Sequence, residues 1–207
     1  MRSLAPFVVL LGLALSAPAG ATTLARLTPD QMTDAADYVV RGTVTAVWTE
    51  QDAGGNVWTK ARVDVAESFK NDAPAELVVE SLGGEYRGLV LEVEYAARYD
   101  VGEDVVLFLS RIGGGERFTT VAMYAGKYTV RTNPADGSEM VVHFSLPYAR
   151  EYDHRFVPNP PVDQRVSLES LESAVRARAE LGWDGQPIPG VSAERLRSIN
   201  KLQTGVK

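Results

Sequence analysis

Three carboxylates lie close together in the stretch ARYDVGEDVVLFLS, residues 97–110, and carboxylates can bind a cation. They are Asp100, Glu103 and Asp104. A calcium-binding loop places its acids at alternating positions around a fixed glycine and closes with a distant glutamate, and this stretch does not have that spacing. We therefore predict a turn with Gly102 at positive φ. The acids are predicted to stay solvated and to protect the apolar strand behind them from aggregation.

Histidine is a common metal ligand, and the chain has two, His143 and His154, with Glu151 and Asp153 beside the second. The two histidines stand eleven residues apart across Pro147, which is no recognised zinc spacing, and a catalytic zinc needs three protein ligands. A metal-dependent hydrolase that uses His143 and His154 is the alternative that this pair leaves open. We predict instead one histidine at a strand end and one on the surface, with no metal and no cofactor.

Other catalytic patterns are missing from the sequence. A serine hydrolase commonly carries a G-x-S-x-G elbow, and none occurs here. The glycine run at residues 113–115 lacks the lysine and the strand-to-helix context of a phosphate-binding loop. Among 27 acidic residues, no pair stands out as a glycosidase pair. We predict that the protein is not an enzyme and has no catalytic residues.

A better candidate for binding lies in residues 57–69, where polar and apolar side chains alternate. Trp58, Lys60 and Arg62 fall on the side opposite the apolar residues. An aromatic ring that stacks and two bases that pair are groups with which a protein surface holds an extended ligand. We predict Trp58, Lys60 and Arg62 as the ligand-binding residues. In the alternative, the C-terminal helix or residues 89–94 cover Trp58, because an exposed tryptophan usually lies under another segment.

The first residues, 1–21, have the pattern of a secretory signal peptide. Arg2 precedes an apolar run, and Ala19-Gly20-Ala21 is a small-x-small cleavage site. The apolar run is too short to span a membrane, and no later segment approaches the ~20 apolar residues of a spanning helix. We therefore predict a secreted or periplasmic protein with Thr22 as its mature N-terminus and no membrane span.

The composition limits both the sources of stability and the partners. The chain has no cysteine, 21 basic and 27 acidic residues, and a net charge of −6, which becomes −7 once the leader and its single base are removed. Disulfides and thiol chemistry are excluded, so stability must come from the burial of apolar surface. A net acidic chain is a poor ligand for nucleic acid, which needs clustered lysine and arginine.

Local patterns predict a short helix followed by a series of strands. Thr28, Pro29 and Gln31 form a helix start with a capping box, and the helix ends near Asp37. In the next segment Gly42 marks a bulge or a sharp bend of the first strand. One face of that strand is predicted to carry Tyr38, Val40, Val44, Ala46 and Trp48.

The second strand is predicted at residues 57–69. Its apolar side is predicted to carry Val57, Thr59, Ala61, Val63, Val65 and Phe69. A third strand is predicted at 76–82 and a short one at 89–94. Five consecutive apolar residues at 105–109 predict a strand that is covered on both faces. Further strands are predicted within 118–131 and 140–144.

The composition changes after residue 144. Several prolines predict an extended linker over residues 145–166. Ser167 can cap a helix over residues 167–182, in which Glu172 and Arg176 form an i,i+4 pair. Residues 183–207 are predicted to be a flexible basic tail with at most a weak amphipathic helix.

Together these elements predict a mainly β fold. We expect a small OB-like β-barrel, closed or partly open, over residues 22–144, with a short N-terminal helix and a C-terminal helix. Four segments carry a resemblance: YVVRGTV (38–44), VDVAESFK (63–70), YDVGEDVVLFL (99–109) and AGKYTV (125–130). They are similar to core and turn motifs of bacterial exported proteins whose OB-like barrel is related to netrin and metalloproteinase-inhibitor (TIMP-like) domains, including cysteine-free, uncharacterised members.

The resemblance implies a fold more than a function. Metalloproteinase inhibitors of that superfamily begin with a cysteine that chelates the protease zinc. The mature chain here would begin Thr22-Thr23, so that mechanism is not carried over. OB barrels commonly hold extended ligands on the outer face of strands 2 and 3. We predict an exported binding module for a protein or glycan partner; an accessory component of a secreted system, docking through the basic tail, is a further alternative.

Overall fold

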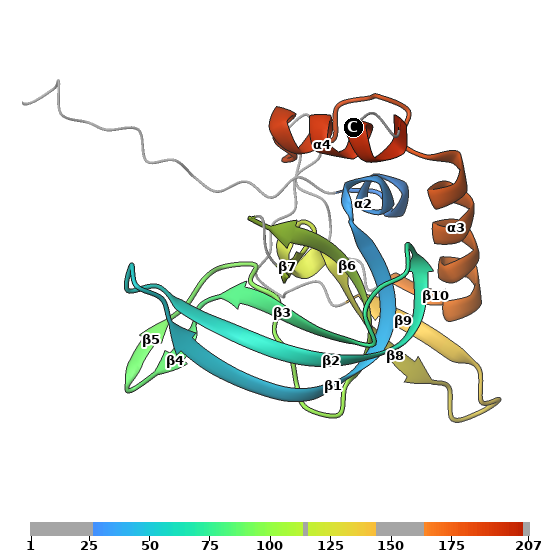
Figure 1. Ribbon diagram of the computed structural model, residues 1–207. Helices are drawn as coiled ribbons and strands as arrows, with labels where there is room; N and C mark the ends of the chain where they lie inside the picture. Colours follow the sequence, from blue (N-terminus) through green and yellow to red (C-terminus); the bar gives the residue numbers. More distant parts are fainter. Residues whose placement is uncertain (1–26, 114–115, 144–163, 205–207) are drawn as a thin grey trace, which may run out of the picture.

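The structure is a computed structural model that describes residues 27–113, 116–143 and 164–204. The predicted signal peptide, His154 and most of the predicted linker lie outside these ranges. The described chain is mainly β, with an eight-stranded mixed sheet and a separate two-stranded hairpin. Helices gather at one end of the sheet, as Figure 1 shows. None of the helices in these ranges combines the length and the apolar character that a membrane crossing requires.

The helices and strands of the described chain do not follow a repeating pattern. Their order is α2 (Pro29–Ala35), β1 (Tyr38–Gln51), β2 (Val57–Lys70), β3 (Glu76–Leu82), β4 (Gly84–Tyr86), β5 (Leu89–Leu91), β6 (Asp104–Ile112), β7 (Arg117–Thr120), the 3-10 helix η2 (Met123–Gly126), β8 (Lys127–Thr132), β9 (Glu139–His143), β10 (Gln164–Ser167), α3 (Leu168–Leu181) and α4 (Ala193–Thr204).

The large sheet contains a ring of strand pairings. Its strand order is β1-β2-β3-β7-β6-β8-β9-β10, and β1 pairs with β6 as well as with β2. Strands β1, β2, β3, β7 and β6 therefore each pair with two others of the five. All these pairings are antiparallel except the short parallel contact of β3 with β7, where Val79 lies opposite Phe118.

Two apolar cores lie on the two sides of β6. Val105, Leu107 and Leu109 point into the core inside the ring. Val106 and Phe108 point into a second core, which lies between the sheet and the helices. All five side chains are fully buried, so the strand has no polar face, and the prediction of a strand covered on both faces is confirmed.

Helix α2 begins as predicted. The Thr28 side chain accepts a hydrogen bond from the Gln31 backbone N–H, and the Gln31 side chain accepts one from the Thr28 N–H. This capping box satisfies donors that the first turn of a helix leaves unpaired. Met32 and Ala35 then bury the apolar side of the helix in the second core.

Two β-bulges correct the predicted faces of the first two strands. The register of β1 against β2 shifts between Val44 and Ala46, so Thr45 is an extra residue. Beyond it Val47 packs inside the ring, and Ala46 and Trp48 point outward instead. A second shift in the register, beside Gly42, reverses the alternation of side chains along β2. Phe69 therefore belongs to the core between the sheet and the helices and not to the interior of the ring. A bulge inserts one residue and thereby reverses the alternation beyond it.

The acidic stretch before β6 is a turn, and two of its acids are paired. Glu103 is nearly buried, with 11% of its side chain exposed, and its carboxylate lies 2.6 Å from Lys127 Nζ. Asp104 binds Arg41 at 2.7 Å. The prediction that the acids stay solvated is therefore wrong for Glu103. Its pairing joins the start of β6 to β8 instead.

Gly102 has φ +87°, as predicted for this turn. Its N–H donates to the Val44 carbonyl at 2.7 Å. We expect Gly102→Val to lower the free energy of unfolding by more than about 1 kcal/mol, because a β-branched residue is strained at positive φ. Val101→Ala is the control, since Val101 is 66% exposed and its change should stay within about 0.5 kcal/mol. Urea denaturation measures both, and equal midpoints for the two variants would contradict the strained turn.

The segment predicted as a basic tail with a weak amphipathic helix contains a helix in the structure. Residues 193–204 form α4, and Ile199 is only 4% exposed, in the same core as α2 and α3. Arg195 donates to the Ala35 carbonyl and lies 2.8 Å from the Asp37 carboxylate. Arg195 of this segment thus binds α2 and Asp37, just beyond the helix.

Lys70, at the end of β2, lies against the C-terminal end of α2. Its ammonium donates to the carbonyls of Thr33 and Ala36 at 2.6 and 2.8 Å. Burial lowers the pKa of Lys70 from 10.5 to about 8, although the Asp34 and Asp37 carboxylates oppose the shift.

The depressed pKa of Lys70 predicts a pH dependence of stability. In the unfolded chain the lysine keeps its proton up to its ordinary pKa, so between about pH 8 and 10.5 the unfolded state binds more protons. Stability should therefore rise with pH through this window, by up to about 3 kcal/mol, and fall again as the pH returns to 8. The difference in unfolding free energy between wild type and Lys70→Met, measured at several pH values, should show this slope. A difference that does not change with pH would contradict the shift.

Candidate functional site

Trp58, Lys60 and Arg62 share one face of β2, as their alternation predicts. The neighbouring Ala61 and Val63 are fully buried inside the ring, so the three side chains point outward. Residues that lie directly opposite in adjacent strands project from the same face. The register places Trp48 and Glu50 of β1 opposite Lys60 and Trp58. On the other side, Glu80 of β3 lies opposite Lys60.

We call this surface the tryptophan face. It comprises Trp48 and Glu50 of β1, Trp58, Lys60 and Arg62 of β2, Glu80 of β3 and Arg117 of β7. The alternation along the sequence identifies only the three residues of β2. Trp48 is missed because the bulge at Thr45 reverses its side, and Glu80 and Arg117 are missed because strand pairing brings them there.

A buried carboxylate organises the cations of the tryptophan face. Glu80 is 2% exposed although it points to the outside of the ring, because basic side chains lie over it. Arg117 donates to its Oε2 through Nε at 2.8 Å and through Nη2, and Lys60 Nζ lies 3.4 Å from its Oε1. Lys60 also donates to Glu50 at 2.5 Å, and this bond raises the pKa of Lys60 above its ordinary value. Both cations are thereby held in fixed positions.

Each tryptophan of the face combines an arginine over its ring with a carboxylate at its N–H. Arg117 lies 5.7 Å from the centroid of the Trp58 ring, and the Trp58 indole donates to Asp52 at 2.9 Å. Arg62 lies 5.8 Å from the Trp48 ring, and the Trp48 indole donates to Glu50 at 2.8 Å. Cation–π contacts of this kind attract the guanidinium to the ring face.

Hydrogen bonds also hold the carboxylate of Asp52, in the turn between β1 and β2. The side chain of Asn56 and the indole of Trp58 donate to it and lower its pKa to about 2. The carboxylate is therefore ionised throughout the physiological range. The hydrogen bond from the Trp58 indole to Asp52 thereby fixes the orientation of the Trp58 ring.

The C-terminal helix, offered above as a cover for Trp58, lies near the other end of β2. Arg176 of α3 binds Glu67 at 2.7 Å and lies 5.4 Å from the Phe69 ring centroid. The other proposed cover, residues 89–94, lies on the opposite face, where it lines a pocket together with Thr59. Trp48 and Trp58 thus remain partly exposed in the described structure.

The histidine alternative receives no support from His143. This side chain is 8% exposed, and its ring lies 5.4 Å from the ring of Tyr124 and 5.0 Å from that of Tyr128. His143 therefore belongs to the aromatic packing at the end of β9, and His154 lies outside the described residues. Within residues 27–113, 116–143 and 164–204, no group of three or more histidine and acidic side chains could hold a metal ion.

Comparisons with known proteins add no relative. A comparison with protein-family models found no match, and a comparison with curated protein sequences found none either. The geometry of the site is therefore the basis for a functional proposal.

Proposed function

We propose that this chain is an exported, non-enzymatic module that binds a partner protein through the tryptophan face. The observation that carries the proposal is the composition of this partly exposed surface, in which two tryptophans each have an arginine over the ring and a buried carboxylate binds Lys60 and Arg117. Residues that dominate the energy of protein interfaces are enriched in tryptophan, tyrosine and arginine. Aromatic–arginine pairs that are already ordered also lose little side-chain entropy on binding.

A protein partner fits this face better than a glycan. A sugar would stack on a tryptophan ring, and an arginine already lies over each of the two rings. A protein partner can bury the rings together with their guanidinium groups, without breaking the cation–π pairs. A polyanion is disfavoured because Lys60 and Arg117 are already paired with carboxylates.

The proposal includes the fold relationship suggested by the sequence. The ring formed by β1, β2, β3, β7 and β6 supports an OB-like barrel, a fold that commonly binds ligands on the outer face of its second and third strands. The tryptophan face includes the outer side of β2 and Glu80 of β3, together with residues of β1 and β7. A relationship to netrin and TIMP-like domains would concern the fold alone, since the cysteine that chelates zinc in the inhibitors is missing.

Affinity capture tests the proposed function. The mature chain, immobilised, is exposed to the extracellular or periplasmic fraction of its source, beside the double variant Trp48→Ala/Trp58→Ala and the control Leu181→Ala. Leu181 is 80% exposed on α3 and lies outside the tryptophan face. We expect a protein that binds wild type and the control but not the double variant. Retention of the same protein by a double variant with a native circular-dichroism spectrum would exclude the tryptophan face as the binding surface.

A further inference from the structure

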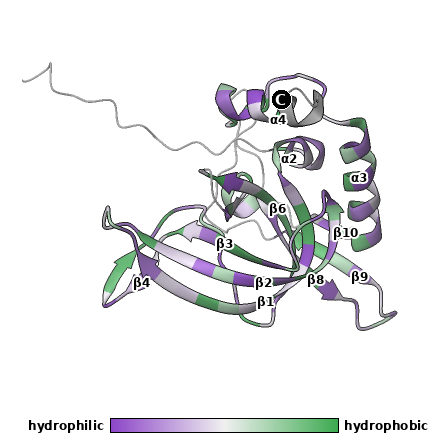
Figure 2. Ribbon diagram, viewed as in Figure 1, coloured by the Kyte–Doolittle hydropathy of each residue, from purple (hydrophilic) through white to green (hydrophobic). Residues whose placement is uncertain are grey.

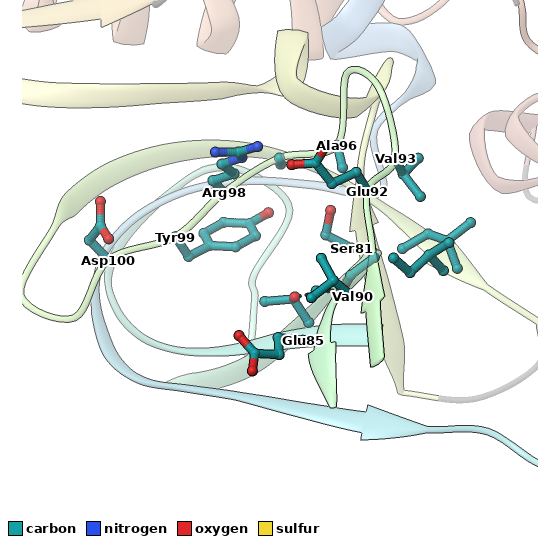
Figure 3. Close-up of a pocket in the computed structure, with 15 residues that line it drawn as sticks. Ser81, Glu85, Val90, Glu92, Val93, Ala96, Arg98, Tyr99 and Asp100 are labelled. Carbon is teal, nitrogen blue, oxygen red and sulfur yellow. Dashed lines mark hydrogen bonds between the residues drawn. The ribbon is translucent and has the colours of Figure 1, made fainter. Parts of the chain in front are cut away.

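A pocket opens on the opposite side of β2 from the tryptophan face, next to the β4–β5 hairpin (Figure 3). Its volume is about 370 Å³. Small-molecule sites typically enclose roughly 300–1,000 Å³ and combine an apolar lining with a few polar groups. The walls of this pocket come from β2, β3, the hairpin and residues 92–100. Three hydroxyl-bearing residues, Thr59, Ser81 and Tyr99, are among them.

Tyr99 is the unusual member of this lining. It is 6% exposed, and its hydroxyl oxygen is buried without a hydrogen-bond partner in the described structure. The Thr120 hydroxyl is near enough to moderate the upward shift that burial gives the pKa of Tyr99, but the two groups do not meet hydrogen-bond geometry. Figure 3 shows the Tyr99 hydroxyl on the side of the ring where Ser81 lies. A buried polar group without a partner is uncommon in native proteins and calls for an explanation such as an ordered water or an ion.

The charged residues of the lining make the pocket acidic. Glu85, Glu92 and Asp100 oppose a single guanidinium, that of Arg98. Within the described ranges, none of the four side chains forms an ion pair. This contrasts with the tryptophan face, where Lys60 and Arg117 are paired. A cation that enters the pocket would therefore meet carboxylates that have no other partner.

The hairpin adds an apolar rim. Val90, which lines the pocket, is 63% exposed, and its neighbour Leu89 is 50% exposed. Figure 2 shows β5 as a hydrophobic strand at the edge of the molecule. Val93 and Ala97 continue the apolar lining toward the interior. The pocket thus offers carboxylates for a positive group and aliphatic surface for the stem that carries it.

We propose that this pocket binds an ammonium group on an aliphatic stem, either a free alkylamine or a lysine side chain of a partner. The carboxylates of Glu85 and Glu92 attract the cation, and Val90 and Val93 contact the stem. The hydroxyls of Ser81 and Tyr99 supply further polar contacts. This site is separate from the tryptophan face, so it stands whether or not the proposed function holds.

Titration of the mature chain with three six-carbon probes tests the charge and the stem together. Hexylamine, 1-hexanol and hexanoate have the same stem and differ in the head group. In ¹H–¹⁵N NMR spectra we expect hexylamine to shift the amides of Ser81, Arg98 and Tyr99, with weaker effects of hexanol and none of hexanoate. The effect of hexylamine should decrease at 0.5 M salt. Equal effects of hexanoate and hexylamine, or shifts spread over the whole surface, would overturn the proposal.

Variants locate the binding groups. Glu92→Gln and Glu85→Gln should each weaken hexylamine binding by about two- to fivefold, as expected for exposed charge pairs. Glu180→Gln, a change at an exposed acid on α3, is the control and should leave the affinity unchanged. Tyr99→Phe should weaken binding without lowering the thermal unfolding midpoint, because the hydroxyl that it removes has no partner in the free protein. Wild-type affinity in both glutamine variants would overturn the assignment.

The two sources of the ammonium group are separated by peptides. Acetyl-Ala-Ala-Lys-Ala-Ala-amide presents a lysine side chain on a backbone, and its norleucine analogue lacks the charge. Tighter binding of the lysine peptide than of hexylamine assigns the pocket to a partner's lysine, and binding of hexylamine alone assigns it to a free amine. Failure of both cations to bind overturns the proposal.

Discussion

Asp34→Asn is expected to lower the free energy of unfolding by about 3 kcal/mol, because it removes the charge of the carboxylate that bonds the Arg178 guanidinium and leaves only the more distant Asp184, at 3.7 Å. Asp34 of α2 receives two hydrogen bonds from Arg178 of α3, at 2.9 and 2.6 Å. The two side chains are only 6% and 17% exposed. The pair connects the N-terminal helix to the C-terminal helix, so its loss should loosen the packing of both helices on the sheet.

The matched control is Glu67→Gln, which removes the carboxylate that Arg176 binds on the same helix. That pair is 41% and 46% exposed, and exposed ion pairs typically contribute about 0–1 kcal/mol. Both variants replace a carboxylate by its amide, so their side chains change little in volume. Denaturant unfolding followed by circular dichroism gives the two free energies. Similar losses for the two variants would show that burial does not determine the strength of these pairs.

Trp58→Ala is expected to weaken binding of the captured partner by at least about 30-fold, the loss of 2 kcal/mol or more that defines an interface hot spot. The same change should lower the free energy of unfolding by less than the truncation of a fully buried ring does, since Trp58 is partly exposed and loses less buried apolar area. Calorimetric titration and denaturant unfolding measure the two effects on the same preparation.

The comparison for Trp58→Ala is Phe108→Ala, a truncation of a fully buried ring. Such truncations typically cost about 3–5 kcal/mol. If Trp58→Ala destabilises the protein as much as Phe108→Ala, then Trp58 is a core residue and the tryptophan face is not a binding surface. If it leaves both stability and affinity unchanged, the partner binds elsewhere.

Much of the local structure could be predicted because it depends on neighbouring residues. The capping box of Thr28 and Gln31 needs only four consecutive residues, and the buried run of residues 105–109 needs only its own composition. The alternation around Trp58, Lys60 and Arg62 likewise determines that these side chains share a face. Gly102 at positive φ follows from the demands of a tight turn.

The position of Trp48 could not be predicted in this way. A bulge such as the one at Thr45 depends on the partner strand, because it is defined by the register in which β1 pairs with β2. The pairing of Glu103 with Lys127 and the burial of Glu80 also depend on strands that are distant in the sequence. Long-range pairing decides whether a charged side chain is solvated or buried, and a single sequence carries no direct record of it.

By itself, the sequence determined that the chain is mainly β, that it has no disulfides and that β2 carries an aromatic residue and two bases on one face. Those properties follow from composition and from the period of two along a strand. Only the tertiary structure decided what surrounds these three residues. Strand pairing brought Trp48, Glu80 and Arg117 beside them, and α3 lies near the other end of β2, where Arg176 binds Glu67. The physical reason is that burial and charge pairing are properties of surfaces in contact, and those surfaces form only when distant segments fold together.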